Sequence, residues 1–125
     1  MTLGQFPAST VLVASDLERA KKFYEEKLGL TPVDGPEGIA MFEAGEGSSV
    51  VIYQKDGGSK AVHTVLGFSV KDLPALLAEL KANGVEQDMD DLPEGTGEDG
   101  IAHYGPVSSA WIKDSEGNII ALNEM

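Results

Sequence analysis

Apolar and polar positions along the chain fall into two similar blocks. One block reads VLVASDLERAKKFYEEKLGLTPV and the other reads LGFSVKDLPALLAELKANGVEQ. When Asp16 is aligned with Asp72, a one-residue shortening also brings Gly29 onto Gly84. Each block contains an apolar strand, an Asp-Leu step, a helical run and a glycine at the helix exit. The repeat predicts two copies of one supersecondary unit.

The first unit is predicted to span residues 8–55 and to follow the order βαβββ. A strand of β-branched and aliphatic residues at 9–14 leads into an amphipathic helix. The N-cap of this helix is either Ser15, in a capping box with Glu18, or Asp16, whose charge suits the helix dipole. Further strands are predicted at residues 30–33, 39–43 and 49–54, with glycine-containing turns between them.

The second unit, predicted over residues 62–124, repeats this order with a longer connection after its helix. Asp72 is the predicted N-cap of that helix. The segment from Asp88 to Gly100 reads DMDDLPEGTGEDG, which is too polar and glycine-rich to hold a core. We therefore predict a long surface loop that carries a solvated acidic run. The predicted strands are 63–70, 102–113 and 118–123, and the last two are joined by a tight turn at 114–117.

Composition favours a single folded domain that spans residues 1–125. The 125 residues are 42% hydrophobic, which is enough for one core and short for two independent domains. Ser, Asp or Gly interrupts every apolar run well below the length that spans a bilayer, so no membrane partner is expected. The N-terminus has no signal-peptide pattern, and we therefore expect a cytoplasmic protein. The absence of Cys excludes disulfides and thiolate metal sites.

The net charge narrows the range of partners. Nine Lys and Arg residues stand against 21 Asp and Glu residues, which gives a formal net charge of -12 at pH 7. This charge repels nucleic-acid phosphates and anionic lipids, so nucleic acid is not an expected partner. The expected ligand is a small molecule that is neutral or cationic.

Two phrases in the sequence resemble the vicinal oxygen chelate superfamily, namely SDLERAKKFYEEKLGL in the first unit and WIKDSEGNIIALNE at the end of the second. This superfamily includes glyoxalase I, extradiol dioxygenases, and fosfomycin- and bleomycin-resistance proteins. The resemblance extends from about Ser9 to Glu124 and implies an α+β fold in which tandem βαβββ units form a half-open barrel with a concave pocket. Because one fold hosts several chemistries, function has to be argued from the site.

The metal-dependent members that the chain resembles carry a His on the first strand of each unit and a Glu on the last strand. The corresponding positions here are Ser9, Val65 and Ala121. None of these side chains supplies the imidazole or carboxylate that a divalent ion requires. We therefore expect no metal and no cofactor.

Strand alternation predicts which side chains face the concave pocket. If Leu12 and Ile120 pack against the helices, the alternate residues of the same strands face the cavity, and most of these are small. Small apolar walls with a few polar groups are typical of a pocket for a partly hydrophobic ligand, unless Trp111, Tyr104 and Met41 fill the space. The predicted ligand-binding residues are Ser9, Val11, Tyr53, His63, Val65, Gly67, Ser69, His103, Tyr104, Trp111, Ala121 and Asn123.

Three classes of function remain open. A metal-independent protein that binds or sequesters a partly aromatic compound comes first, because the metal ligands are missing while the small-residue cavity remains. A lyase or isomerase that uses His63, His103 or Tyr104 for proton transfer is the second class. An interaction or regulatory module with a vestigial pocket is the third. The exposed sheet edges of each unit predict a homodimer, and the loop at 88–100 is expected to act as a lid.

Overall fold

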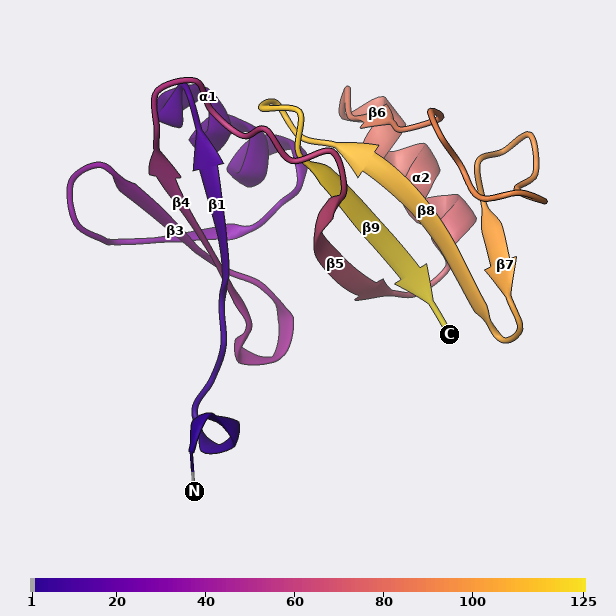
Figure 1. Ribbon diagram of the computed structural model, residues 1–125, viewed down its shortest axis with the longest axis horizontal. Coiled ribbons are helices and arrows are strands. Elements are labelled where there is room, and N and C mark those ends of the chain that lie inside the picture. The colour runs from indigo at the N-terminus through magenta and orange to yellow at the C-terminus, as the bar shows by residue number, and fades with distance from the viewer. Residues whose placement is uncertain (1) are drawn as a thin grey trace. The chain divides into compact units, whose positions relative to one another are not determined.

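The computed structural model describes residues 2–125 (Figure 1). The chain divides into two compact units, with the boundary between Lys60 and Ala61. Each unit contains its own curled, unclosed β-sheet and one main helix. The predicted α+β fold with two repeated units is confirmed.

The first unit arranges its strands in the order β1-β4-β3-β2. β1 pairs in parallel with β4, and the remaining pairs are antiparallel. The elements are β1 (Thr10–Ala14), α1 (Leu17–Lys22), β2 (Thr31–Val33), β3 (Ile39–Glu43) and β4 (Ser49–Gln54), with short 3₁₀ turns at Leu3–Gln5 and Gly45–Gly47 and a π-helical turn at Phe23–Lys27.

The core of the first unit lies between its helical segment and its sheet. Phe23 and Tyr24 occupy the π-helical turn, and both are buried. The ring of Tyr24 lies 5.7 Å from the ring of Phe23 and 5.9 Å from the ring of Phe42, measured between centroids. The contact between Tyr24 and Phe42 joins the helical segment to β3.

The second unit has the strand order β5-β9-β8-β6, and β7 pairs with the first residues of β8, whereas β6 pairs with the last ones. β5 and β9 are parallel, whereas β8 is antiparallel to β9, β6 and β7. The elements are β5 (Thr64–Val70), α2 (Leu73–Ala82), β6 (Glu86–Gln87), β7 (Ala102–Tyr104), β8 (Val107–Lys113) and β9 (Ile119–Glu124).

The prediction of one continuous strand over residues 102–113 is wrong. The chain instead forms the hairpin of β7 and β8, which turns at Gly105 and Pro106. Gly105 has a φ of 59°, a conformation that glycine adopts without steric cost, and Pro106 has no N–H to donate to a ladder. The Gly-Pro pair in the sequence is the signal that marks this turn.

Both main helices begin at an aspartate cap. The Oδ1 of Asp16 accepts a hydrogen bond from the N–H of Arg19 at 3.1 Å, so Asp16 rather than Ser15 caps α1. The Oδ1 of Asp72 accepts a hydrogen bond from the N–H of Ala75 at 3.4 Å. No helix within residues 2–125 is long and apolar enough to cross a membrane.

Helix α2 receives a further cap from the far end of the chain. The carboxylate of Glu124 accepts hydrogen bonds from the N–H of Leu73 at 2.8 Å and from the N–H of Asp72 at 3.2 Å. These two N–H groups belong to the first helical turn, where no intrahelical acceptor exists. The last residue of β9 therefore connects the sheet to the start of α2.

Candidate functional site

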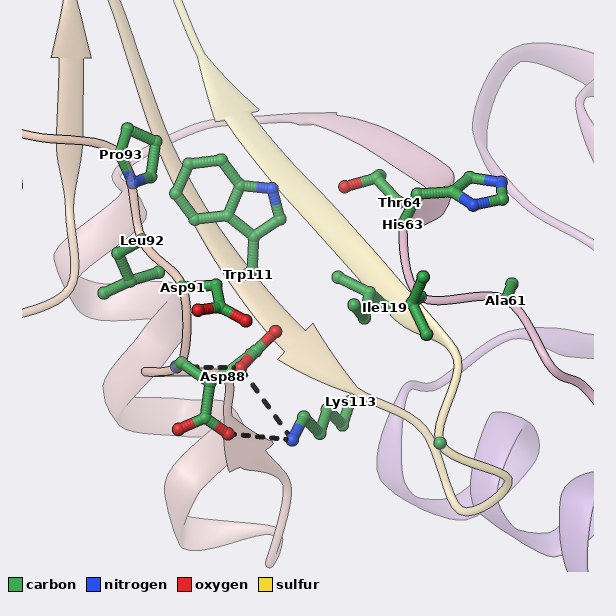
Figure 2. Close-up of a pocket in the computed structure, with 13 residues that line it drawn as sticks. Ala61, His63, Thr64, Asp88, Asp91, Leu92, Pro93, Trp111, Lys113 and Ile119 are labelled. Atoms are coloured by element: carbon green, nitrogen blue, oxygen red, sulfur yellow. Dashed lines mark hydrogen bonds and ion pairs between the residues drawn. The ribbon is translucent and has the colours of Figure 1, made fainter.

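A pocket of about 470 Å³ lies at one end of the second sheet (Figure 2). β5 and β9 both begin at this end, because they are parallel, and β8 ends there, because it is antiparallel to β9. The loop that follows β6 forms another side. The pocket is lined by Ala61, Val62, His63, Thr64, Asp88, Asp90, Asp91, Leu92, Pro93, Trp111, Lys113, Gly117 and Ile119.

Trp111 gives the pocket its aromatic wall. It lies opposite Ala121 in the β8–β9 ladder, and the methyl group of Ala121 is too small to cover an indole. Figure 2 shows the indole with Leu92 and Pro93 on one side and Ile119 on the other. An aromatic ring among aliphatic side chains offers a surface for a flat, partly apolar ligand.

Lys113 forms an ion-pair network with two aspartates of the loop. Its Nζ lies 3.3 Å from Oδ2 of Asp90 and 3.9 Å from Oδ1 of Asp88. The N–H of Asp90 donates to the same Oδ1 of Asp88 at 3.0 Å, and the N–H of Asp88 donates to the carbonyl of Trp111 at 2.8 Å. The hydrogen bond to Asp90 and the charge of Asp88 hold the pKa of Lys113 above its ordinary value of 10.5. The network ties the start of the loop to the end of β8.

The prediction that the whole acidic run is solvated is wrong at Asp88. This residue is only 6% exposed, although its neighbours Asp90 and Asp91 are exposed. An acidic run in a loop is normally solvated. Asp88 is buried because Lys113, from a strand much later in the chain, supplies the charge that a buried carboxylate needs.

The turn between β8 and β9 is fixed by Asp114. Its Oδ1 accepts hydrogen bonds from the N–H groups of Glu116 and Asn118, each at 2.8 Å. Its Oδ2 accepts a hydrogen bond from the Nδ2 of Asn118 at 2.9 Å, and both residues are buried. This turn sets the positions of the flanking residues Lys113 and Ile119, which line the pocket.

The first unit contains the predicted ligand-binding residues Ser9, Val11 and Tyr53. The hydroxyl of Ser9 forms a hydrogen bond with the hydroxyl of Ser49 at 2.5 Å. Val11 and Tyr53 are exposed on the sheet face that is turned away from α1. None of the three lines the pocket beside Trp111.

In the second unit, the predicted residues His63 and Trp111 line this pocket. Figure 2 shows the imidazole of His63 pointing away from Trp111. The predicted residues that pair between β5 and β9 share the sheet face of Trp111 but lie outside the pocket lining, and these are Gly67, Ser69, Ala121 and Asn123. Val65 lies at a register irregularity of β5 and is also outside the lining. The side chain of Asn123 accepts a hydrogen bond from the Oγ of Ser109 at 2.7 Å.

His103 and Tyr104 point to opposite faces of β7, because they are neighbours on a strand. The Nδ1 of His103 lies 3.0 Å from the Oγ of Ser108. Tyr104 is exposed opposite Val107. Neither side chain lines the pocket, and the two do not form a proton-transfer pair.

Sequence reasoning missed Asp88, Asp91 and Lys113 as pocket residues. Lys113 could have been found, because it lies two residues after Trp111 on the same strand and alternation places both on one face. Whether Asp88 and Asp91 reach the pocket depends on the path of an irregular loop. No periodicity in the sequence encodes that path.

A second pocket of about 470 Å³ lies in the first unit, between α1 and the turn that joins β2 to β3. Lys21 and Glu18 of the helix border it and form an ion pair at 3.5 Å. Its aromatic lining residue, Phe42, is 2% exposed and offers almost no surface to a ligand. The pocket beside Trp111 is therefore the candidate site.

The positions at which the resemblance places metal ligands do not fit a metal. The hydroxyl of Ser9 is hydrogen-bonded to the hydroxyl of Ser49, and the side chains of Val65 and Ala121 have no atom that could coordinate a metal. Over the part of the chain that the structure describes, no three His, Asp or Glu side chains are grouped so that they could hold a metal ion.

The chain belongs to the glyoxalase/bleomycin resistance protein/dioxygenase superfamily, whose family model matches residues 7–122. The resemblance seen in the two sequence phrases is thereby confirmed. No curated protein matches the sequence.

Solved structures with this fold include proteins with several named roles. An antibiotic binding protein, TnmS3, from Streptomyces sp. CB03234 is 23% identical with a TM-score of 0.70, over 96% of this chain and 97% of that chain. The fosfomycin resistance protein FosX from Mesorhizobium loti is 16% identical with a TM-score of 0.64, over 97% of this chain and 92% of that chain. A glyoxalase/bleomycin resistance protein from Catenulispora acidiphila DSM 44928 is 24% identical with a TM-score of 0.67, over 97% of this chain and 99% of that chain. At these identities the comparisons establish the fold alone.

Proposed function

We propose that this chain binds a small, partly aromatic molecule, neutral or cationic, in the pocket beside Trp111, and that it does so without a metal. The observation that carries the proposal is the aromatic wall of Trp111 in a pocket of about 470 Å³ with aliphatic and acidic sides. This volume suits a drug-sized ligand. One structural relative is named an antibiotic binding protein. We therefore favour a role in which the chain sequesters such a partly aromatic molecule.

The charge of the pocket supports a ligand that is not anionic. The carboxylates of Asp88, Asp90 and Asp91 line it together with one ammonium group, that of Lys113. The whole chain carries a net charge of -12. An anion would enter a negative potential with one nearby cation to offset it.

A lyase or isomerase is the less favoured alternative. Such an enzyme needs a proton-transfer group that reaches the ligand. His63 lines the pocket, but its ring is turned away from Trp111, and His103 and Tyr104 lie outside the lining. A binding role asks only for the walls that the pocket has.

We also propose that the chain forms a homodimer. The face of the first sheet that is turned away from α1 carries a group of apolar side chains, each more than a third exposed. These are Val11 at 59%, Val33 at 39%, Ile39 at 36% and Tyr53 at 40%. A contiguous apolar surface of this kind is normally covered by a partner, and a second copy is the partner that we propose.

The single Trp of the chain makes the binding proposal directly testable. Neutral, cationic and anionic aromatic compounds are titrated while the fluorescence of Trp111 is followed, and we expect saturable changes with neutral or cationic compounds. Binding measured by calorimetry should weaken about tenfold in Trp111→Ala, because an aromatic contact is lost. The matched control Tyr104→Ala removes an exposed aromatic outside the pocket and should retain full affinity.

Two results would contradict the binding proposal. One is full affinity in Trp111→Ala, and the other is a preference for phosphates or polycarboxylates. Turnover of a bound compound that is lost in His63→Gln would favour the enzyme alternative. Metal independence is tested separately by elemental analysis, in which one equivalent of tightly held Zn, Ni, Mn or Fe would refute it.

A further inference from the structure

The carboxylates that line the pocket are not equivalent. Asp88 and Asp90 share the ammonium group of Lys113, at 3.9 Å and 3.3 Å. Asp91 forms no hydrogen bond or ion pair through its side chain with any residue in the described range 2–125. Because Lys113 brings one positive charge to three carboxylates, the charge of Asp91 is left without compensation.

The backbone of Asp91 has a left-handed conformation. Its φ is 50°, in a region that Asp and Asn tolerate better than most other residues with a side chain. Asp91 and Trp111 both line the pocket, and Figure 2 shows the Asp91 carboxylate near the base of the Trp111 side chain.

An aromatic face beside an uncompensated carboxylate suits one kind of ligand. A cation with a flat apolar body can pair its charge with Asp91 and lay its body against Trp111, which also attracts the cation through its π-electrons. A neutral compound would gain only the contact with Trp111. An anion would be repelled by Asp91.

We propose that Asp91 anchors a single positive charge of the ligand while Trp111 holds its flat apolar body. The pocket then selects a monocationic aromatic compound over its neutral and anionic counterparts. This inference rests on the proposed function and narrows it, because the proposed function alone also admits neutral ligands. Asp88 and Asp90 have the different role of holding the loop through Lys113.

The test uses a pair of probes that differ in charge and not in shape. The cation is 1-methylquinolinium, and its uncharged counterpart is 1-methylnaphthalene. Binding is followed by the NMR signal of the indole N–H, which is unique because the chain has one Trp. We expect the wild-type protein to bind the cation about tenfold more tightly than the neutral probe.

Three variants separate an anchor from a general field effect. Asp91→Asn removes the charge and keeps the backbone, because Asn tolerates the left-handed region, and it should weaken binding of 1-methylquinolinium about tenfold. Asp90→Asn makes the same charge change on a carboxylate already paired with Lys113, and the loss should be at most about threefold. Glu46→Gln is the matched control, with a φ of 54° at a position outside this pocket, and it should leave affinity within about twofold.

Each outcome has a distinct meaning. Equal losses in Asp91→Asn and Asp90→Asn would overturn the anchor role of Asp91. Equal binding of both probes to the wild type would overturn charge selection and leave the proposed function standing. No change of the Trp111 signal with either probe would overturn the inference, and the proposed function is then decided by the wider compound screen. Thermal unfolding of Asp91→Asn should match the wild type, which shows that any lost binding is not lost folding.

Discussion

The two units of the chain share one fold plan and differ in the length of a single connection. In the first unit, a short turn at residues 34–38 joins β2 to β3. In the second unit, residues 88–106 separate β6 from β8 and include β7. This added segment supplies Asp88, Asp91 and Leu92 to the pocket beside Trp111. The repeat therefore builds the fold, and the inserted loop builds the candidate site.

The sheet faces turned away from the helices also differ between the units. In the first unit this face carries Val11, Ile39 and Tyr53, which are exposed and apolar or aromatic. In the second unit it carries Trp111 and Lys113, and the loop covers one end of it. A face of the first kind suits another protein surface, whereas a face of the second kind suits a ligand. The predictions that follow test these differences.

The largest expected effect is on the β8–β9 turn. In Asp114→Ala, the buried donors of Asn118 lose their acceptor, and the free energy of unfolding should fall by about 3 kcal/mol. The counterpart turn of the first unit is held by Ser48, whose Oγ donates to the carbonyl of Gly45 at 2.7 Å in an exposed position. Ser48→Ala should therefore lose less than about 1 kcal/mol. Urea unfolding measures both, and equal losses would show that the two turns are held alike.

The next effect concerns the proposed dimer face of the first unit. Val11→Asp places a charge in the apolar surface, and the dimer should dissociate at least about tenfold more readily. Light scattering across a concentration series measures this. Tyr104→Asp, which adds the same charge at an exposed position of the second unit, is the control and should leave the mass unchanged. A wild-type protein that is monomeric at micromolar concentration would refute the dimer.

A smaller effect distinguishes the caps of the two helices. The register places Gln54 beside Ala14 in the first unit where Glu124 lies beside Val70 in the second. Glu124→Gln keeps the shape and removes the charge that accepts two hydrogen bonds at the start of α2, so it should cost about 1 kcal/mol. Gln54→Ala should cost less, since Gln54 is exposed. Thermal unfolding that ranks the two variants in the opposite order would contradict this difference.

The sequence was readable where structure depends on local pattern. The observed β3 and β4 coincide with the predicted strands at 39–43 and 49–54, because both are short apolar runs between glycine-containing turns. The β7–β8 hairpin was missed, although its Gly-Pro pair was visible. Trp111 was among the predicted residues because it lies on a strand. Asp88 and Asp91 were not, because the burial of Asp88 depends on its contacts with Trp111 and Lys113 of β8 and the position of Asp91 depends on the path of an irregular loop.

The smallest expected effect is a pH dependence of the contact between the loop and β8. The hydrogen bond to Asp90 and the charge of Asp88 raise the pKa of Lys113 above 10.5 in the folded protein. A raised pKa means that the ion pair stabilises the folded protein fully at a pH below the pKa of Lys113 in the unfolded chain. This stabilisation is lost as the pH rises through the pKa in the folded protein. Trp111 fluorescence, recorded from about pH 9 to pH 12, should therefore show a transition above 10.5 that is absent from Lys113→Gln, because only the wild type loses this ammonium. Because the variant lacks only this ammonium group, identical profiles in the two proteins would mean that Lys113 does not hold the loop on β8.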